Sequence, residues 1–178
     1  MRKFLIVLLR IFKQPLLVLR HNSVPFSTRL GGRNFLLNSK LGKWSYIGNN
    51  SMLIDVKMGN YCSIAPFVII GGMNHSYESF STSPRLNNKC FYTTRRVGHD
   101  VWIGANAIVL QGVSIGNGAV IGAGSIVTKD IPENSIAMGT PAKVVKQRFT
   151  KEKWEAIKKL EYWKFPPRQA REILSMME

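Results

Sequence analysis

The sequence predicts an all-β solenoid, in which short parallel strands coil around one core. Read in sixes from residue 97, the chain gives VGHDVW, IGANAI, VLQGVS, IGNGAV, IGAGSI and VTKDIP. Val or Ile opens each block, and Gly follows it in four of the six. Such a fixed period indicates stacked repeats, with the aliphatic side chains inward and the small residue after them allowing a tight corner. Strands paired as hairpins would instead show an alternation of period two.

Length, composition and charge bound the class of protein. The 178 residues suit one domain, and 45% hydrophobic with 20% charged residues indicates a chain that folds. Lys and Arg number 25 against 10 acidic residues, a formal net charge of +15 that favours anionic ligands or surfaces. The two cysteines, Cys62 and Cys90, have no metal-ligand spacing and cannot establish a disulfide framework. We therefore expect a reducing, cytoplasmic setting.

Residues 1–30 form a basic, apolar segment ahead of the repeats. No acidic residue precedes Asp55, and the longest uncharged runs in the first 20 residues, 4–9 and 14–19, are far shorter than the roughly 20 residues that cross a bilayer. No small-residue cleavage site follows, so a secretory signal is not expected. Two interpretations stay open: a segment lying on the inner, anionic face of a membrane, or a helix packed on the domain or on a neighbouring subunit.

The repeat domain is predicted over residues 31–149. FLLNSK from 35, LGKWSY from 41 and IGNNSM from 47 keep the period, and Leu53 opens the next block. One residue is then lost beside Asp55, after which MGNYCS from 58 and IAPFVI from 64 resume the register.

Residues 72–96 interrupt the repeat. Ile70 and Gly71 still keep phase, so the chain leaves the solenoid only after the coil has fixed its backbone. A solenoid accepts an insertion at a corner, and we expect this segment to project as a loop. Long loops in compact domains are usually functional.

At this point the chain resembles a known family. The stretch VWIGANAIVLQGVSIGNGAVIGAGSIVTKDIP, running into MGTPAKVVKQRF, is similar to the hexapeptide-repeat acyltransferases. The resemblance implies a left-handed parallel β-helix, usually a homotrimer, that transfers an acyl group from coenzyme A. The tail KEKWEAIKKLEYWKFPPRQAREIL, in residues 150–178, resembles the C-terminal helices of the xenobiotic and polysaccharide O-acetyltransferase branch.

The resemblance implies a catalytic loop histidine, and His75 falls where the family has it. Acyl transfer to an alcohol needs the hydroxyl proton withdrawn, and an imidazole with an ordinary pKa of about 6.5 can accept it near neutrality. His99 is expected on a solvated coil face and His21 on the N-terminal segment. An exposed loop imidazole without a catalytic role is the alternative for His75.

Candidate acceptor-binding residues come from one coil of the repeat and from the loop of this histidine. Asp55 sits where related enzymes often place an acceptor-binding side chain, and its carboxylate can accept from two sugar hydroxyls, although a corner residue capping local amides would look the same. The other candidates share the loop and could shape the acceptor pocket: Asn74, Tyr77, Glu78 and Phe80.

The resemblance also implies a groove for acetyl-coenzyme A. Trp102 is expected either to wall the groove or to fill a subunit interface. Backbone beside small residues would bind the pantetheine arm, at Gly104, Gly122, Ala123 and Gly124. The nucleotide end would lie against Thr128, Lys129, Thr140, Pro141, Ala142, Lys143 and Arg148. Lys143 and Arg148 are the candidates for phosphate contacts, with a solvated basic surface as the alternative.

The predicted function is direct O-acetyl transfer from acetyl-coenzyme A to a sugar hydroxyl. The expected acceptor is a bacterial surface polysaccharide or its precursor. A small-molecule acceptor such as an antibiotic is the alternative, and a non-catalytic scaffold is the alternative of another class. His21, His75 and His99 do not resemble a three-histidine metal site, so no metal is predicted. No nucleic acid is expected, because no recognition helix, nucleotide-binding sheet motif or aromatic ladder is present.

Overall fold

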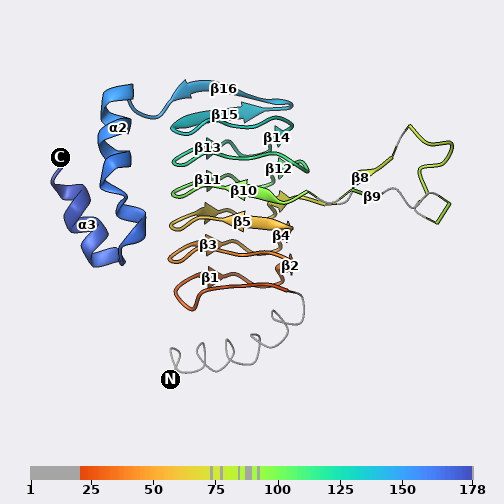
Figure 1. Cartoon of the computed structure of the whole chain (residues 1–178), viewed down its shortest axis with the longest axis horizontal. Helices are drawn as coiled ribbons and strands as arrows, with labels where there is room; N and C mark the ends of the chain where they lie inside the picture. The colour runs from red at the N-terminus through yellow and green to blue at the C-terminus, as the bar shows by residue number, and fades with distance from the viewer. Residues whose placement is uncertain are drawn as a thin grey trace.

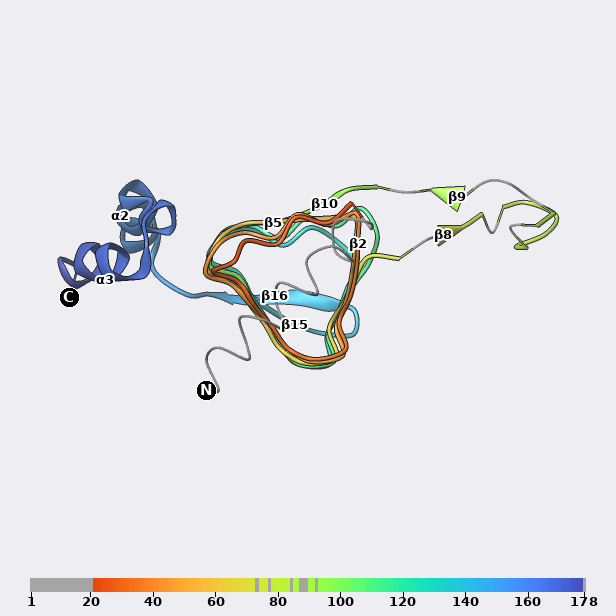
Figure 2. The ribbon, with the colours of Figure 1, turned by 90° about the horizontal axis from the view of Figure 1, so that it is seen from below.

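The computed structural model describes residues 21–72, 74–76, 78–83, 85–86, 90–91 and 93–177. Within these ranges the chain winds into a stack of triangular coils, seen from the side in Figure 1 and along the stack in Figure 2. Each coil contributes one short strand or bridge to each of three faces. A long loop leaves one corner of the triangle, and the C-terminal helices lie at the opposite end of the view (Figure 2).

Two of the faces are continuous sheets. The seven-stranded face consists, in order, of β1 (Arg29–Leu30), β3 (Tyr46–Ile47), β6 (Ser63–Ile64), β11 (Trp102–Ile103), β13 (Val120–Ile121), β15 (Ser135–Gly139) and β16 (Ala142–Gln147). The five-stranded face consists of β14 (Ile126–Val127), β12 (Ile108–Val109), β7 (Ile69–Ile70), β4 (Met52–Ile54) and β2 (Phe35–Leu37). All of these strands pair in parallel except β15 with β16.

The third face, here called the two-stranded face, pairs β5 (Val56–Met58) with β10 (Arg95–Val97) in parallel. Single bridges extend it in both directions, joining Ser23 to Lys40, Lys40 to Lys57, Val97 to Ile115 and Ile115 to Ile131. The coil therefore closes between β5 and β10 although the loop separates them in sequence. The loop carries its own antiparallel pair, β8 (Asn74–His75) with β9 (Cys90–Phe91).

The period of six sets the core, as predicted. Ile103 pairs with Ile121, three blocks further on, and Val109 pairs in the same way with Val127. The inward side chains stack into columns that are 1% exposed or less: Ile47, Leu53, Ile64, Ile70, Ile103, Val109, Ile121 and Val127. Each coil thus buries the aliphatic side chains of its neighbours.

Three boundaries differ from the sequence prediction. The block expected to open at Phe35 opens one residue later, since Leu36 is buried and pairs with Leu53 while Phe35 is 37% exposed. The pattern could not separate these two residues because both are large and apolar. The described coils also begin ahead of residue 31, with the bridge at Ser23, and the chain rejoins the solenoid at Arg95 rather than Val97.

The glycines at the second block position allow neighbouring coils to approach, rather than providing the corner torsion that we expected. A Cβ on Gly48 would lie 2.4 Å from the backbone nitrogen of Pro66, and one on Gly104 would lie 2.5 Å from Ala123 N. The left-handed corner residue comes two positions later, with φ of 57° at Asn50 and 59° at Asn106. Asn tolerates this conformation better than most residues.

The C-terminal tail is helical, with α2 (Lys151–Leu160), the short 3₁₀ helix η1 (Tyr162–Lys164) and α3 (Pro167–Ser175). Thr150 caps α2 by accepting a hydrogen bond from Lys153 N at 3.3 Å. The tail buries a second apolar cluster of Trp154, Ile157, Tyr162, Trp163 and Ala170. No helix in the described ranges combines the length and the hydropathy that a bilayer crossing requires.

The spacing of the coils makes a testable prediction at Gly48. Gly48→Ala should lower the free energy of unfolding by about 1 to 3 kcal/mol, because the new methyl group must push the next coil away. Gly32→Ala is the matched control, since a Cβ there meets nothing within 4 Å. Urea unfolding of both variants measures the difference, and equal midpoints would contradict this account of the second-position glycines.

Candidate active site

The loop leaves the solenoid through two glycines. Gly71 N still donates a hydrogen bond to the Val109 carbonyl at 2.9 Å, so it belongs to the coil. Gly71 has a φ of 95° and Gly72 a φ of 128°, values that side-chain-bearing residues avoid. A Cβ on Gly71 would also collide with the Ile54 carbonyl and lie 2.9 Å from Arg95 Cζ. Gly71 is therefore needed for both torsion and space, and Gly72 for torsion alone.

His75 lies on β8, opposite Cys90 of β9, and its side chain is exposed. Its Nδ1 lies 2.7 Å from the carbonyl oxygen of Thr82, on the far part of the same loop. A carbonyl only accepts hydrogen bonds, so this contact assigns the proton of the neutral imidazole to Nδ1. The other nitrogen, Nε2, then carries the lone pair that can accept a proton from a substrate.

Arg95, which the sequence reading missed, joins the base of the loop to Asp55. Its side chain is 0% exposed, with Nη1 donating to the Ile54 carbonyl at 2.8 Å and Nη2 to the Gly72 carbonyl at 3.1 Å. Nη1 also lies 3.9 Å from Asp55 Oδ2. Burial lowers the pKa of Arg95, and the nearby Asp55 carboxylate opposes that shift. Arg95 thus fixes the point where the loop leaves the coil relative to Asp55.

Asp55 occupies the corner between β4 and β5 with a φ of 55°. Its Oδ1 accepts a hydrogen bond from Asn38 Nδ2 at 2.6 Å, and Asn38 holds the equivalent corner one coil away. The carboxylate therefore contacts Asn38 and Arg95, in a fixed position near the base of the loop. Arg95 lies two residues before the inward Val97, so the register of the strand points it inward, but its charge makes it resemble a loop residue in the sequence.

The remaining loop candidates have fewer described contacts than His75 and Asp55. Asn74 lies on β8 opposite Phe91. Glu78 and Phe80 are both exposed, and Phe80 extends fully into solvent. Tyr77 lies outside the described residues. The structure of this single chain does not bring Glu78 or Phe80 against His75 or Asp55.

Several donor-site candidates gather near the hairpin of β15 and β16. Thr140 Oγ1 donates to the Gly124 carbonyl at 3.5 Å, and a Cβ on Gly122 would lie 2.8 Å from Met138 Cβ. Met138 is the strand partner of Lys143. Ala123, Thr128 and Lys129 are exposed on neighbouring corners, while Pro141 and Ala142 continue the hairpin after Thr140. Two exposed lysines, Lys129 and Lys143, thus lie among the donor-site candidates.

Trp102 and Gly104 lie on the same coil, around β11. Trp102 points outward and is 55% exposed, with Ser63 and Val120 as its strand neighbours. In the single chain its ring does not fill the core, which leaves both predicted roles open. Gly104 lies directly against Ala123 of the next coil.

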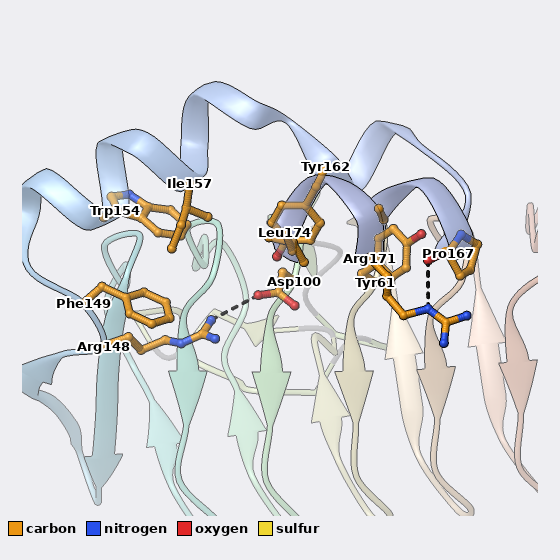
Figure 3. A pocket seen from close by; sticks show the side chains of 11 residues that line it. Tyr61, Asp100, Arg148, Phe149, Trp154, Ile157, Tyr162, Pro167, Arg171 and Leu174 are labelled. Atoms are coloured by element: carbon orange, nitrogen blue, oxygen red, sulfur yellow. Dashed lines mark hydrogen bonds and ion pairs between the residues drawn. The ribbon is translucent and has the colours of Figure 1, made fainter. Parts of the chain in front are cut away.

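Arg148, the other candidate for a phosphate contact, is held beside the helical tail. Its Nη1 donates to the Gly118 carbonyl at 2.6 Å and pairs with Asp100 Oδ2 at 3.2 Å, and its guanidinium lies over the Phe149 ring. The pair borders a cavity of about 410 Å³ between the tail and the coils (Figure 3). Arg148 therefore helps to hold the helical tail on the solenoid.

His99 also supports the tail, and the expectation that it lies on a solvated face is wrong. Its ring stacks on Trp163, with centroids 5.4 Å apart, and its Nδ1 accepts a hydrogen bond from Asn60 N at 2.9 Å. Burial lowers the pKa of His99; Glu161 acts in the opposite direction and Lys164 in the same one. Within the described ranges, no group of three or more His, Cys, Asp or Glu is placed to hold a metal ion.

Comparison with known proteins identifies the family. The family model described as the hexapeptide repeat of succinyl-transferase matches residues 96–129. A probable macrolide acetyltransferase of Lysinibacillus sphaericus is 35% identical over 135 residues, which is 67% of this chain and 72% of that protein. This chain belongs to the hexapeptide-repeat acetyltransferases.

Two further members of the family are informative. A chloramphenicol acetyltransferase of Klebsiella aerogenes is 34% identical over 137 residues, 67% of this chain, and the match spans 64% of that relative's length. A galactoside acetyltransferase solved in complex with coenzyme A superimposes with a TM-score of 0.63 at 30% identity, covering 80% of this chain and 74% of that one. The likeness confirms the predicted fold class, a left-handed parallel β-helix of hexapeptide repeats.

The contacts of His99 predict a pH dependence of stability. The unfolded chain takes up a proton at His99 below its ordinary pKa of 6.5, whereas the folded chain takes it up only at lower pH. The stability that His99 contributes should therefore be complete above pH 6.5 and should fall as the pH drops below it, until the folded pKa is reached.

Unfolding midpoints at pH 7.5 and 5.5, followed by fluorescence of Trp154 and Trp163, measure this dependence. His99→Phe keeps an aromatic ring against Trp163 but cannot titrate, so its midpoint should change less between the two pH values. His21→Gln, at an exposed histidine, is the control and should retain the wild-type difference. The same pH difference in wild type and His99→Phe would contradict the assignment.

Proposed function

We propose that this protein transfers an acetyl group from acetyl-coenzyme A directly to a hydroxyl of a sugar, in a bacterial surface polysaccharide or its precursor. The observation that carries the proposal is the contact between His75 Nδ1 and the Thr82 carbonyl at 2.7 Å, which leaves Nε2 as a base on the loop. Membership of the acetyltransferase family supports the donor and the reaction type. Asp55, fixed by Asn38 and Arg95, supports acceptor binding near the base of the loop.

The chemistry follows from the free nitrogen of His75. Nε2 takes the proton of the acceptor hydroxyl as its oxygen attacks the thioester carbonyl carbon. The tetrahedral intermediate collapses with breakage of the carbon–sulfur bond. The imidazolium then returns the proton to the leaving thiolate, so that the products are an O-acetyl ester and free coenzyme A. The Thr82 carbonyl stabilises the imidazolium through the Nδ1 proton.

We also propose that three chains assemble with the active sites between subunits. The outward positions of the five-stranded face form an apolar row in strict register: Phe35, Met52, Ile69, Ile108 and Ile126. Phe35 and Met52 are 37% and 38% exposed in the single chain, so the row is open to a partner. A neighbouring subunit packed there would cover it and bring a donor groove toward the loop of His75.

Two alternatives remain for the acceptor and the activity. The chloramphenicol and macrolide acetyltransferases among the relatives favour a small-molecule acceptor such as an antibiotic. Assay of free antibiotics and oligosaccharides with acetyl-coenzyme A separates the two acceptor classes, because turnover of antibiotics alone would contradict a sugar acceptor. A folded protein with no turnover on either class would favour a non-catalytic scaffold. Contact of the segment 1–20 with a membrane stays a prediction from sequence, since those residues lie outside the described ranges.

His75→Ala should lower kcat by roughly 10² to 10⁴ with little change in the KM for acetyl-coenzyme A. The base acts in the transition state, whereas the donor is bound elsewhere. His21→Ala is the control and should retain full turnover. Both variants are assayed as the assembled protein, which should have three times the 20.1 kDa mass of the chain by light scattering. Wild-type turnover in His75→Ala would rule out its role as the base.

Lys143→Ala should raise the KM for acetyl-coenzyme A about tenfold, as loss of a charge-assisted hydrogen bond to phosphate would. The loss should be smaller with dephospho-coenzyme A if Lys143 contacts the 3′-phosphate. Lys146→Ala, on the same strand β16, is the control for a general loss of positive charge. Equal losses with both donors would place the 3′-phosphate contact elsewhere.

A further inference from the structure

Three cations occupy successive outward positions on the two-stranded face. Lys40 pairs with Lys57 through a parallel bridge, and Lys57 pairs with Arg96 in the register of β5 and β10. All three side chains are exposed. We call Lys40, Lys57 and Arg96 the cationic ladder.

The ladder places like charges side by side. Neighbouring strands lie about 4.8 Å apart. The three side chains therefore leave the sheet at equivalent positions on adjacent strands, in a row that runs along the stack. Like charges directly opposite each other destabilise a sheet. A long side chain can bend away from its neighbour, but three consecutive cations in register still form a strip of concentrated positive charge.

The acidic residues that the structure describes do not neutralise this strip. The sequence has no acid before Asp55, and of its ten acids only Glu178 lies outside the described ranges. Asp55 is engaged by Asn38 and Arg95. Asp130, farther along the stack, accepts a hydrogen bond from Ser114 N at 2.7 Å. Among the described residues, none forms an ion pair with a ladder cation.

The ladder begins at the base of the loop that carries His75. Arg96 follows Arg95, the residue that binds the Gly72 carbonyl, and Lys57 lies two residues after Asp55. In Figure 2, β5 and β10 lie on one edge of the triangle, which meets the corner where the loop leaves. A ligand on the ladder would therefore extend away from the proposed acceptor site.

We propose that the cationic ladder binds the acidic groups of an anionic glycan acceptor, beyond the sugar that is acetylated. This inference rests on the proposed function and specifies its substrate class, a polymer with repeated carboxylate or phosphate groups. Lys40 and Lys57 offer point charges, and Arg96 offers a forked pair of donors to one acid group. A membrane fits the face less well. Its outward row carries no large exposed hydrophobic side chain among the described residues, whereas interfacial binding buries an apolar face.

Direct binding of a tetra- to hexasaccharide of galacturonate tests the proposal without acetyl transfer. This probe has one carboxylate per sugar, and its methyl ester has the same sugars without the charge. By calorimetry at low salt, wild type should bind the acid and not the ester, with an affinity that falls at least tenfold when salt is raised to about 0.3 M. Absence of binding to the acid, or equal binding of acid and ester, would overturn the proposal.

The variant Lys40→Gln/Lys57→Gln/Arg96→Gln should lose at least tenfold in affinity. A second triple variant, Lys151→Gln/Lys153→Gln/Lys159→Gln on α2, removes the same charge from exposed positions of the tail and should bind like wild type. Equal losses in the two variants would show attraction by net charge alone and would overturn the proposal. Thermal midpoints provide the structural check: the ladder variant should melt no lower than wild type, because repulsion has been removed.

Vesicles of phosphatidylglycerol or phosphatidylcholine separate the glycan from a lipid surface. If the ladder variant loses binding to phosphatidylglycerol vesicles but keeps its affinity for oligogalacturonate, the surface serves a membrane and the proposal fails. If the cationic ladder does not bind the glycan, the expected effect of His75→Ala on turnover is unchanged. If His75 is not the catalytic base, the expected binding of oligogalacturonate is unchanged. The two hypotheses are therefore tested independently.

Discussion

Stacking of the inward aliphatic side chains sets the spacing between successive coils of this fold. Ile47 lies on Ile64, and Ile103 on Ile121, so each coil is buried only by the coils next to it. The stack is close enough that Gly48 and Gly104 have no room for a side chain. Since the outward residues follow the same register, equivalent positions on different coils form straight rows. The apolar row of the five-stranded face and the cationic ladder both arise from this constraint.

The candidate site depends on how the solenoid accommodates an insertion. On the two-stranded face, β5 pairs directly with β10, so the coil is complete without the loop. A buried guanidinium then connects the closed coil to the start of the loop, through the carbonyls of Ile54 and Gly72. Burying an arginine is costly unless it is paired and hydrogen-bonded. Here the cost is offset by two carbonyls and the Asp55 carboxylate, which hold the exit of the loop near the acceptor candidate.

The repeat was predictable because its signal is local and periodic. Aliphatic residues at every sixth position give the core directly, and the loss of phase after Gly71 locates the loop. Roles that depend on contacts between distant segments were not predictable. The sequence places Arg148 near the predicted phosphate contacts, but it gives no sign of the ion pair with Asp100, 48 residues away in the sequence. His99 looked like a solvated coil residue because the ring that covers it, Trp163, comes from the tail.

The hairpin of β15 and β16 has a consequence for the molecule as an assembly unit. A β-helix of identical coils would expose, at its end, a strand edge able to accept the first coil of another molecule, and so could polymerise end to end. β16 runs back antiparallel to β15 and occupies that edge. Its residues Lys143 and Lys146 add positive charge there, which opposes the approach of a second basic chain. At its C-terminal end the seven-stranded face is thereby closed to growth by a further strand.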